Sequence, residues 1–589
     1  MYRIIIALLV FGFGFSYSNF MYDEDDWYIV KSLDQIQSFT ETNHSEIIIG
    51  TINGVFVYDN LTDELSYDMY LSRDLPSLNI KNIFYDKNTD HVWLYHDEGV
   101  SFKSYSSFSY RHLPTSDLID QGLSFIDDIG SSDNYIWFRR GDLIVALNSF
   151  TGKFVQFSKS KSEINNIVWG SSMFGYSGDK IDLSSHYISN IDWSIGYRLN
   201  NVNSEYIDYN VFFDEYGDQV IPTVKFTDSN NNTWFGTDRG FVFVSWGRSR
   251  KLEHIESGLQ GNPTSGVFID TQNNWWFYDS RNIRANRFND FSLYDKKNNL
   301  LTFWNEYQGK WKNYKTNESI DIQSNDINHI SEYANNILIA TMSGLLKYDG
   351  SWSLLDMGDG LLDNSIEKIE STKSRVFTLT QSGINEINIS SFSVMPTEFN
   401  SFKNTEIYDI VIIEQDSIFS CKDRFFENID ECTYYCDTTF GDTSICSHID
   451  LEEMIVSTSK GLYSVDLKTD LTTYLHPKSC YQMEQNNLNL FCLDNGVWMI
   501  NLLQPSDGFR HIVQEENIRN FTLSDNYIWT NLISRVRLMN LDSGESWYYN
   551  ESDGILGANI YEVGNNQDWI WFLSDKGVSI YNWRKYHGN

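Results

Sequence analysis

A short hairpin pattern recurs along the chain and constrains its fold more than any other feature. Each copy reads as an apolar strand, a tight turn that carries glycine, and a second apolar strand. Glycine is expected there because a tight hairpin turn requires a positive φ. The copies span residues 47–58, 92–103, 233–244, 337–348, 376–387, 454–465, 491–500 and 570–581.

The spacing of these turns predicts the architecture. In the second half they fall at Gly344, Gly383, about Arg424, Gly461, Gly496, about Ser534 and Gly577. Repeats of roughly 40 residues hold four short strands and are typical of propeller blades. Helical solenoids have a similar period, but these segments are short runs of β-branched and aromatic residues without a 3.6-residue period.

The first half is less regular. Its turns fall at Gly54, Gly99, Gly141, about Gly178, Gly240 and about Arg281. One of the two longer gaps leaves room for a seventh, degenerate unit. We therefore predict an all-β fold of two tandem seven-bladed β-propellers at residues 19–305 and 306–589, with six plus seven blades as the alternative. Residues 26–31 are predicted to form a closing strand near the N-terminus.

The residues that flank the turns are also similar from copy to copy. Residues 360–369 lead into the copy at Gly383, 552–560 lead into the copy at Gly577, and 348–352 follow the turn at Gly344. This pattern resembles the two-component-regulator propeller repeat of bacteria over most of residues 30–585. In that family, paired seven-bladed propellers form the periplasmic sensors of hybrid histidine kinases, and a similar pair makes up most of an accessory protein of the type IX secretion system.

The resemblance has limits in this sequence. We expect no kinase, receiver or C-terminal sorting segment after the repeats. The resemblance therefore implies an exported recognition module, as a sensor or an envelope accessory, and does not imply signalling by this chain alone.

The N-terminus reads as an export signal. Arg3 precedes an apolar run at residues 4–15, which is too short to span a bilayer of about 30 Å. Small residues at Ser16 and Ser18 predict a signal peptide of residues 1–18, cleaved after Ser18. An uncleaved anchor is the alternative. We expect a periplasmic or secreted bacterial protein without a membrane span after cleavage.

Cysteine placement fits an oxidising compartment. All six cysteines lie between residues 421 and 492. Cys480 and Cys492 flank a hairpin centred near Asn486, which predicts a disulfide across two antiparallel strands. The other four allow three pairings, with a metal site as the alternative: Cys421, Cys432, Cys436 and Cys446.

Charge and motifs exclude several functions. The chain has 44 Lys plus Arg against 80 Asp plus Glu, a formal charge of −36. Phosphate backbones and anionic membranes repel such a chain, so we expect no nucleic-acid partner. No His-Glu-x-x-His, Gly-x-Ser-x-Gly or P-loop motif occurs. We therefore expect no cofactor, no metal site and no catalytic residues.

Basic residues gather in three equivalent turns of the first half. They are Arg139, Arg140, Arg239, Arg281 and Arg284. Asp238 and Asp279 sit beside them and could orient sugar hydroxyls. Arginines on one rim would focus an anionic ligand such as an acidic glycan. The alternative is that these are solvated turns that tolerate arginine.

The tryptophans could pack between sheets or bind a ligand, and two acidic loops could be plain turns or ligand sites. Trp93, Trp137, Trp234, Trp276, Trp529 and Trp571 recur at one strand position, which predicts packing between sheets. Trp275, Trp304 and Trp311 break the repeat and are candidates for exposed ligand stacking. Asp228 resembles a sialidase Asp-box and Asp86 a calcium loop, but a plain turn is favoured for both.

The sequence predicts function only as a class. The favoured interpretation is a non-catalytic, exported protein that binds an anionic glycan or an envelope protein. The alternative is a polysaccharide lyase or hydrolase on the same scaffold, because a fold does not determine a function. A structural subunit of an envelope machine would show a contiguous exposed apolar patch above about 400 Å².

Overall fold

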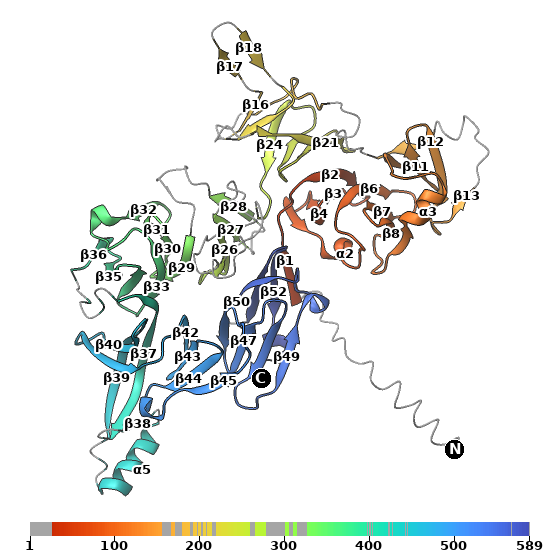
Figure 1. Cartoon of the computed structure of the whole chain (residues 1–589). Helices are drawn as coiled ribbons and strands as arrows, with labels where there is room; N and C mark the ends of the chain where they lie inside the picture. Colours follow the sequence, from red (N-terminus) through yellow and green to blue (C-terminus); the bar gives the residue numbers. More distant parts are fainter. Residues whose placement is uncertain are drawn as a thin grey trace, which may run out of the picture. The chain divides into compact units, whose positions relative to one another are not determined.

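The computed structural model is built almost entirely from strands, which make up 55% of it, while helices make up 8%. It divides into two compact units (Figure 1). Unit 1 comprises residues 1–28, 263–301 and 315–589, and unit 2 comprises 29–262 and 302–314. The structure describes residues 26–155, 166–170, 180–188, 193–259 without 197, 202–203, 208 and 215–218, 266–278, 301–305, 310–314 and 327–587 without 397–398, 400–401, 403–404, 422–423, 427, 442, 444–445 and 567.

Unit 2 is a series of small sheets. Their strand orders are β2-β3-β4-β5, β6-β7-β8-β9, β13-β12-β11-β10-β14, β15-β24-β23-β22-β21, β16-β19-β20 and β17-β18. The elements are β2 (Ile36–Glu41), β3 (Ile47–Thr51), β4 (Gly54–Asp59), β5 (Glu64–Tyr67), α2 (Met69–Ser72), β6 (Ile80–Asp86), β7 (His91–His96), β8 (Gly99–Ser104), β9 (Arg111–Pro114), α3 (Thr115–Asp120), β10 (Asp128–Ser132), β11 (Tyr135–Arg140), β12 (Leu143–Asn148), β13 (Phe154–Val155), β14 (Val168–Trp169), β15 (Tyr187–Ile188), β16 (Trp193–Ile195), β17 (Arg198–Asn201), β18 (Ser204–Ile207), β19 (Phe212–Asp214), β20 (Gln219–Val220), β21 (Pro222–Thr227), β22 (Thr233–Thr237), β23 (Val242–Ser245) and β24 (Lys251–Ile255).

Unit 1 continues the pattern. Its strand orders are β29-β30-β31-β32, β33-β34-β35-β36, β38-β37-β39-β40-β41, β42-β43-β44-β45, β46-β47-β48-β49 and β1-β52-β51-β50. The elements are β1 (Trp27–Val30), β29 (Ile327–Tyr333), β30 (Asn336–Thr341), β31 (Gly344–Tyr348), β32 (Trp352–Leu355), η5 (Met357–Asp359), β33 (Ile366–Ser371), β34 (Val376–Thr380), β35 (Gly383–Asn388), β36 (Ser393–Val394), β37 (Ile407–Cys421), β38 (Arg424–Phe426), α5 (Ile429–Phe440), β39 (Ser447–Thr458), β40 (Gly461–Asp466), β41 (Leu471–His476), β42 (Gln482–Asn486), β43 (Asn489–Leu493), β44 (Val497–Asn501), η8 (Pro505–Asp507), β45 (Arg510–Val513), β46 (Phe521–Ser524), β47 (Tyr527–Asn531), β48 (Val536–Asn540), β49 (Ser546–Tyr549), η9 (Glu551–Asp553), β50 (Ile560–Asn566), β51 (Trp569–Ser574), β52 (Gly577–Asn582) and α6 (Arg584–His587).

One further sheet has the order β25-β26-β27-β28. Its strands are β25 (Gly266–Ile269), β26 (Asn274–Tyr278), β27 (Leu301–Asn305) and β28 (Lys310–Tyr314). Within unit 1, β25 contacts both β29 and β50.

The predicted glycine turns join the second and third strands of the sheets. In one of them, Thr341 Oγ1 donates to the Gly344 carbonyl at 2.8 Å and accepts from Ser343 N at 3.0 Å. Gly344 has a φ of 139°, which a residue with a Cβ adopts only under strain. The same Thr-to-Gly hydrogen bond closes the turns at Thr51–Gly54, Thr380–Gly383 and Thr458–Gly461.

One predicted repeat is wrong. Arg424 was expected near the turn of a separate blade, but it begins β38, a short strand on the edge of β37. β37 and β39 are 15 and 12 residues long and pair with each other directly. The strands between residues 407 and 476 therefore form one five-stranded sheet, in which β37 and β39 are elongated. The predicted turn near Gly178 lies outside the described residues.

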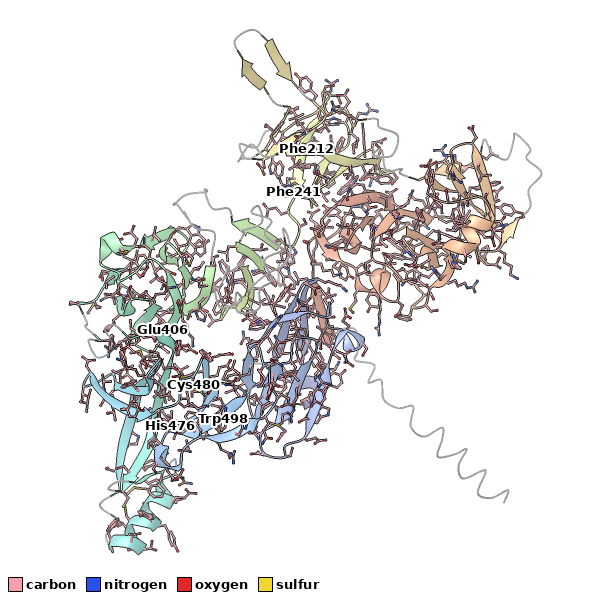
Figure 2. All side chains as sticks on the ribbon, in the orientation of Figure 1. Phe212, Phe241, Glu406, His476, Cys480 and Trp498 are labelled. Carbon is pink, nitrogen blue, oxygen red and sulfur yellow. A yellow bond between two sulfur atoms is a disulfide. The ribbon has the colours of Figure 1, made fainter. Side chains whose placement is uncertain are left out.

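Neighbouring sheets pack face to face. In unit 2, Tyr58 of β4 meets Trp234 of β22 at a centroid distance of 5.0 Å, and Trp93 lies 6.2 Å from Phe138. In unit 1, buried clusters join the sheet of β29 to that of β33, then β33 to β37, β37 to β42, β42 to β46, and β46 to β50. Around the labelled Phe212 and Phe241, the core of unit 2 is equally aromatic (Figure 2).

The predicted packing tryptophans are buried. Trp93, Trp137, Trp234, Trp276, Trp529 and Trp571 all belong to the core. Trp275 and Trp304 are buried as well, so the expectation that they are exposed for ligand stacking is wrong. Trp304 stacks on Trp311 with 5.2 Å between ring centroids. These rings lie between adjacent sheets because each ring buries a large apolar area there.

The predicted closing strand forms. β1 is hydrogen-bonded to β52 at the edge of the last sheet. Trp27 stacks on Tyr581 at 4.6 Å and is buried in the same cluster as β46 to β52. Lys585 of α6 pairs with the buried carboxylate of Asp26 at 2.7 Å. Asp26 and Trp27 are thereby fixed to the C-terminal sheet of unit 1.

Asp228 organises a plain turn, as expected. Its Oδ1 accepts from the backbone N–H of Asn230 and Asn232, and its Oδ2 accepts from Asn232 Nδ2 at 2.9 Å and Trp234 Nε1 at 3.0 Å. Asp270 makes the equivalent four contacts, including one from Trp276 Nε1 at 3.0 Å. One carboxylate thus holds the turn and satisfies a buried indole N–H.

The calcium interpretation of the loop at Asp86 finds no support. Asp86 accepts from Asn88 N at 3.2 Å and Thr89 Oγ1 at 2.6 Å, which closes an ordinary turn. Among the residues that the structure describes, no three His, Cys, Asp or Glu side chains are placed to hold a metal ion.

Asp228→Ala should lower the free energy of unfolding by about 2–3 kcal/mol, because it leaves the buried indole N–H of Trp234 and two backbone N–H groups without their acceptor. Urea unfolding followed by tryptophan fluorescence measures this change. Thr227→Ala, at the neighbouring exposed strand end, is a control that removes no such acceptor. Equal stabilities of Asp228→Ala and the parent protein would contradict the assigned role.

Candidate binding site

Arg139 and Arg239, which lie in two of the three arginine turns, are each paired with a carboxylate. Arg139 forms an ion pair with Asp128, which is 4% exposed, and its guanidinium lies 4.7 Å from the Trp169 ring. Arg239 lies 3.7 Å from a carboxylate oxygen of Asp214. A partner carboxylate cancels most of the field that such a side chain offers to an anion.

The other predicted residues of this rim are bound locally or not described. Arg140 donates to the Gly122 carbonyl at 2.7 Å and covers the Phe125 ring at 4.8 Å. Asp238 accepts from Ile221 N at 2.8 Å, so its carboxylate holds a turn. Asp279, Arg281 and Arg284 lie outside the described residues. A single basic rim made of these residues stays a prediction.

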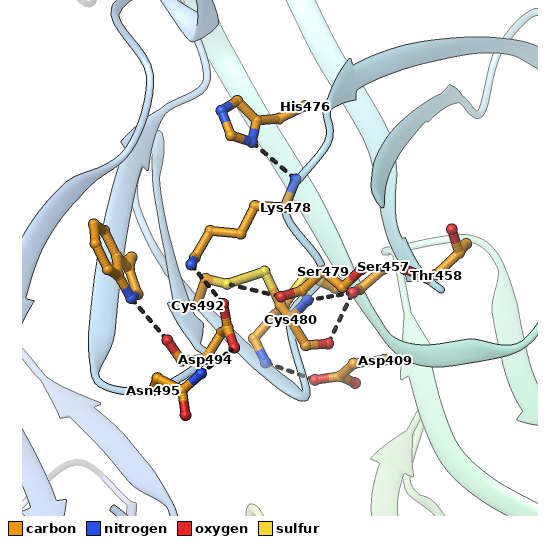
Figure 3. Close-up of a disulfide and its surroundings, with 12 residues drawn as sticks. Asp409, Ser457, Thr458, His476, Lys478, Ser479, Cys480, Cys492, Asp494 and Asn495 are labelled. Carbon is orange, nitrogen blue, oxygen red and sulfur yellow. Dashed lines mark hydrogen bonds and ion pairs between the residues drawn. A yellow bond between two sulfur atoms is a disulfide. The ribbon is translucent and has the colours of Figure 1, made fainter. Parts of the chain in front are cut away.

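Cys480 and Cys492 are joined by a disulfide with 5.2 Å between their Cα atoms (Figure 3). The pairing is the predicted one, but the geometry differs. Cys480 precedes β42, and Cys492 stands opposite Met483. Ser457 Oγ donates to the Cys480 carbonyl at 2.7 Å and accepts from Cys480 N at 2.8 Å. The bond therefore fixes the connection between two successive sheets.

The remaining cysteines are also paired. Cys421 is bonded to Cys436 and Cys432 to Cys446, which selects one of the three possible pairings. A metal site made of these four residues is therefore excluded, because disulfide sulfur has no thiolate to offer a metal.

Charged and aromatic side chains surround the Cys480–Cys492 bond. Lys478 pairs with Asp494 at 2.6 Å, and its ammonium lies 4.2 Å from the centre of the Trp498 ring. On its other face Trp498 stacks on His511, with centroids 3.9 Å apart and an interplanar angle of 2°. Figure 3 shows Lys478 and Asp494 converging beside the disulfide. Stacking and ion pairing hold these side chains in one arrangement.

Two more residues extend this group. Lys460 precedes the turn glycine Gly461, is exposed, and donates to Thr405 Oγ1 at 3.3 Å. His476 ends β41, stands opposite Leu462 of β40, and accepts from Lys478 N through Nδ1 at 3.0 Å. We call the set the turn-end cluster, and it consists of Lys460, His476, Lys478, Asp494, Trp498 and His511.

The turn-end cluster contains a neutral histidine. Burial, followed by the charge of Lys478, lowers the pKa of His476. Its Nδ1 is occupied as an acceptor, so Nε2 carries the proton and is a donor. Beside it, Tyr408 and Tyr481 face each other at 5.2 Å, and Tyr481 is 39% exposed. The turn-end cluster thus offers ammonium groups and an N–H donor.

Sequence reasoning missed the turn-end cluster. Lys460 occupies the same turn position that drew attention to Arg239, immediately before the turn glycine. Two basic residues, Lys460 and Lys478, shortly precede the predicted Cys480–Cys492 disulfide in a chain that has few basic residues. This pattern could have pointed to the turn-end cluster.

A second polar group lies where the first strands of neighbouring sheets meet. Lys368 of β33 pairs with Asp409 of β37 and with Glu370, each at 2.9 Å, and donates to the Ile410 carbonyl at 2.8 Å. Asp409 also accepts from Met483 N of β42. These contacts connect three successive sheets through one ammonium and one carboxylate.

The chain of contacts continues past β42. Glu484 accepts from Leu523 N at 2.8 Å and from Thr522 Oγ1 at 3.3 Å, both on β46. On the next sheet, Asn565 Nδ2 donates to the Leu523 carbonyl at 2.7 Å. Polar contacts between first strands therefore link the sheets from β33 to β50.

These first strands carry acidic and basic side chains whose pKa values are strongly shifted. Burial raises the pKa of Glu484 to about 8 and that of Glu562 to about 7. Burial, with the nearby charge of Lys368, lowers the pKa of His329 to about 3. Lys368 keeps its charge, because the attraction of Asp409 and Glu370 outweighs its desolvation and raises its pKa.

No protein-family model and no curated protein matches this chain. Solved structures do resemble it. The extracellular domain of BT4673 from B. thetaiotaomicron, described as a one component system, is 13% identical over 95% of this chain and 83% of its own, with a TM-score of 0.36. PorZ, a surface component of the type-IX secretion system of Porphyromonas gingivalis, is 9% identical over 95% and 87%, with a TM-score of 0.45.

The extracellular domain of BT3049, from a hybrid two component system of B. thetaiotaomicron, is 14% identical over 93% of this chain and 68% of its own, with a TM-score of 0.28. These are the classes of protein that the repeat pattern resembles. At such TM-scores the likenesses add no argument about function, and the fold rests on the sheets themselves. Within the described part of the chain, no helix is both long and apolar enough to cross a bilayer.

The two shifted glutamates predict a pH dependence. Each has a folded-state pKa above its ordinary 4.5. Their stabilising effect is therefore complete below about pH 4.5 and is lost as the pH rises through 7 and 8. His329 acts in the opposite sense, because its contribution is present above pH 6.5 and is lost toward pH 3.

We expect the free energy of unfolding of the parent protein to fall between about pH 6 and about pH 9, and Glu484→Gln to make that fall less steep. Urea titrations at several pH values measure both slopes. Glu551→Gln, at an exposed site, is the control and should leave the slope unchanged. Identical slopes for Glu484→Gln and the parent would contradict the assignment.

Removing the Cys480–Cys492 bond with the double substitution Cys480→Ser and Cys492→Ser should lower the free energy of unfolding by about 2–3 kcal/mol, the amount expected for a short closed loop. Guanidinium unfolding of the two proteins compares them directly. A change below about 0.5 kcal/mol would show that the connection is held by the Ser457 contacts alone.

Proposed function

We propose that the chain is an exported, non-catalytic recognition protein made of two seven-bladed β-propellers. In unit 1, six sheets pack in chain order from β29 to β52, and β25 contacts both β29 and β50. The sheet of β25 would thus be the seventh blade and complete the ring. For unit 2 we propose a second propeller. Because the sheet of β25 covers residues 266–314, this arrangement moves the boundary between the propellers from near residue 305, as the sequence predicted, to near residue 263.

Export is supported by the cysteines. All six are paired, and disulfides persist in oxidising compartments. We therefore retain the proposal of a signal peptide at residues 1–18, cleavage after Ser18, and a periplasmic or secreted location.

The observation that carries the recognition proposal is the turn-end cluster. It places the exposed Lys460 and the N–H donor of His476 at the same end of one sheet. The Lys478–Asp494 pair, the ring of Trp498 and the disulfide hold this end against the next sheet. Preorganised donors bind an anion with little loss of entropy. We propose that an anionic glycan binds here, with an anionic face of an envelope protein as the other ligand of the same chemistry.

Calorimetric titration of the mature protein with polygalacturonate, and with neutral dextran as the control glycan, tests the proposal. We expect binding of polygalacturonate only, weakened about 5–10-fold by Lys460→Ala, because one charged hydrogen bond is lost. Higher salt should weaken it further. Lys576→Ala is the matched control, because Lys576 holds the same position before Gly577 in another sheet and pairs with Glu551 at 3.3 Å.

Three outcomes would count against the proposal. Equal losses for Lys460→Ala and Lys576→Ala would mean that the turn-end cluster is not the site. A larger loss for Arg239→Ala would move the site to the first half, where Asp214 already neutralises that arginine. Release of reducing ends or of unsaturated products from polygalacturonate would favour the lyase or hydrolase alternative.

A further inference from the structure

The sheet of residues 407–476 carries an element that its neighbours lack. The first strands of the other sheets of unit 1 described above are four to seven residues long, whereas β37 has 15 residues and pairs with β39 past an irregularity between Gln415 and Ile418. At the end of this strand pair lies α5 (Figure 1). We call residues 418–449 the stapled hairpin.

The stapled hairpin has a small core of its own. Cys421, Cys432 and Cys436 are buried in it, and Phe419 and Tyr435 pack against them. The two disulfides join α5 to β37 and to the segment that leads into β39. A 12-residue helix is marginal alone in water, so these bonds are what keep α5 folded at this position.

The ends of α5 are also capped. Asn428 Oδ1 accepts from Asp430 N at 2.8 Å at the start, and Gly441 ends the helix with a φ of 69°. The helix therefore begins and ends at defined residues, and its two disulfides hold it in place.

The outer face of α5 is apolar in part. Tyr434 is 73% exposed, Ile429 is 52% exposed and Phe440 is 39% exposed. The buried face is made by the cysteines and Tyr435, so Tyr434 contributes little to the folding of the hairpin. An exposed tyrosine on a helix that two disulfides hold in place is the kind of side chain that anchors protein interfaces.

All the charged side chains of α5 are acidic. Asp430, Glu431 and Asp437 are exposed, and the sequence has no Lys or Arg from residue 425 to residue 459. Asp430 and Glu431 lie in the first turn, where the helix dipole favours negative charge. Asp437 lies in the last turn, where the dipole disfavours it, so helix stability does not account for this carboxylate.

We propose that the stapled hairpin docks a protein partner whose surface is basic around an apolar socket for Tyr434. Complementary charge would steer the partner and set the orientation, and burial of the tyrosine ring would supply affinity. The disulfides lower the entropic cost because the helix is ordered before it binds. An anionic membrane is disfavoured as the occupant, because it would repel this acidic face.

This surface is separate from the turn-end cluster. Helix α5, which carries Tyr434, precedes Ser447, the first residue of β39, and Lys460 follows the last residue of that strand, Thr458. A strand of 12 residues spans about 40 Å. The two proposals can therefore fail independently, and Lys460→Ala should leave partner docking unchanged.

Site-specific photocrosslinking in cells of the source organism tests the docking surface. A benzophenone amino acid replaces Tyr434 in one protein and, as the matched control, Tyr474 in another, because Tyr474 is 52% exposed on β41 of the same sheet. We expect one discrete protein adduct from position 434 and none from position 474. The adduct is identified by mass spectrometry, and the partner is purified and titrated against the mature chain.

In that titration, Tyr434→Ala should weaken binding about 10–30-fold, as for an interface hot spot, and Tyr474→Ala should not. Asp437→Lys separates recognition from stability, because it should leave the thermal unfolding of the protein unchanged or raised while binding falls about 5-fold or more. No adduct at position 434, an adduct only to lipid, a partner with an acidic surface, or full binding by Tyr434→Ala would overturn the proposal.

Discussion

Packing between the faces of neighbouring sheets is the interaction on which the rest of the structure depends. A sheet of four strands, most of them four to seven residues long, cannot bury enough apolar area alone to balance its ordering entropy. Each sheet therefore contributes large rings to its neighbour, as Tyr58 and Trp234 do at 5.0 Å. Strand β1 meets a related requirement. It pairs with β52, whose backbone N–H and C=O groups at the edge of the last sheet would otherwise stay unpaired.

The glycine turns could be read from the sequence because a local φ requirement leaves a local signal. Gly344 and Gly383 stand where the pattern places them, and the closing strand at Trp27 forms. The pattern failed at Arg424 for a physical reason. Two elongated strands and a disulfide-bonded helix occupy about as many residues as one repeat, so spacing alone cannot distinguish an inserted hairpin from a blade.

The binding residues were harder to predict, because the sequence gives their position but not their partners. Arg139 and Arg239 do lie near strand ends, but Asp128 and Asp214 already pair with them. Tertiary packing alone decides which carboxylate reaches which cation. The same holds for Lys478, whose contacts with Asp494 and Trp498 come from the following sheet.

The central claim is that rigid, mutually packed sheets form closed rings that present binding surfaces at their ends. A crystal structure of residues 19–589 is its most direct test. The account predicts seven sheets around one axis in unit 1, with β25 between β29 and β50 and with β1 in the sheet of β52. An open arc of sheets, or a β1 that pairs elsewhere, would contradict it.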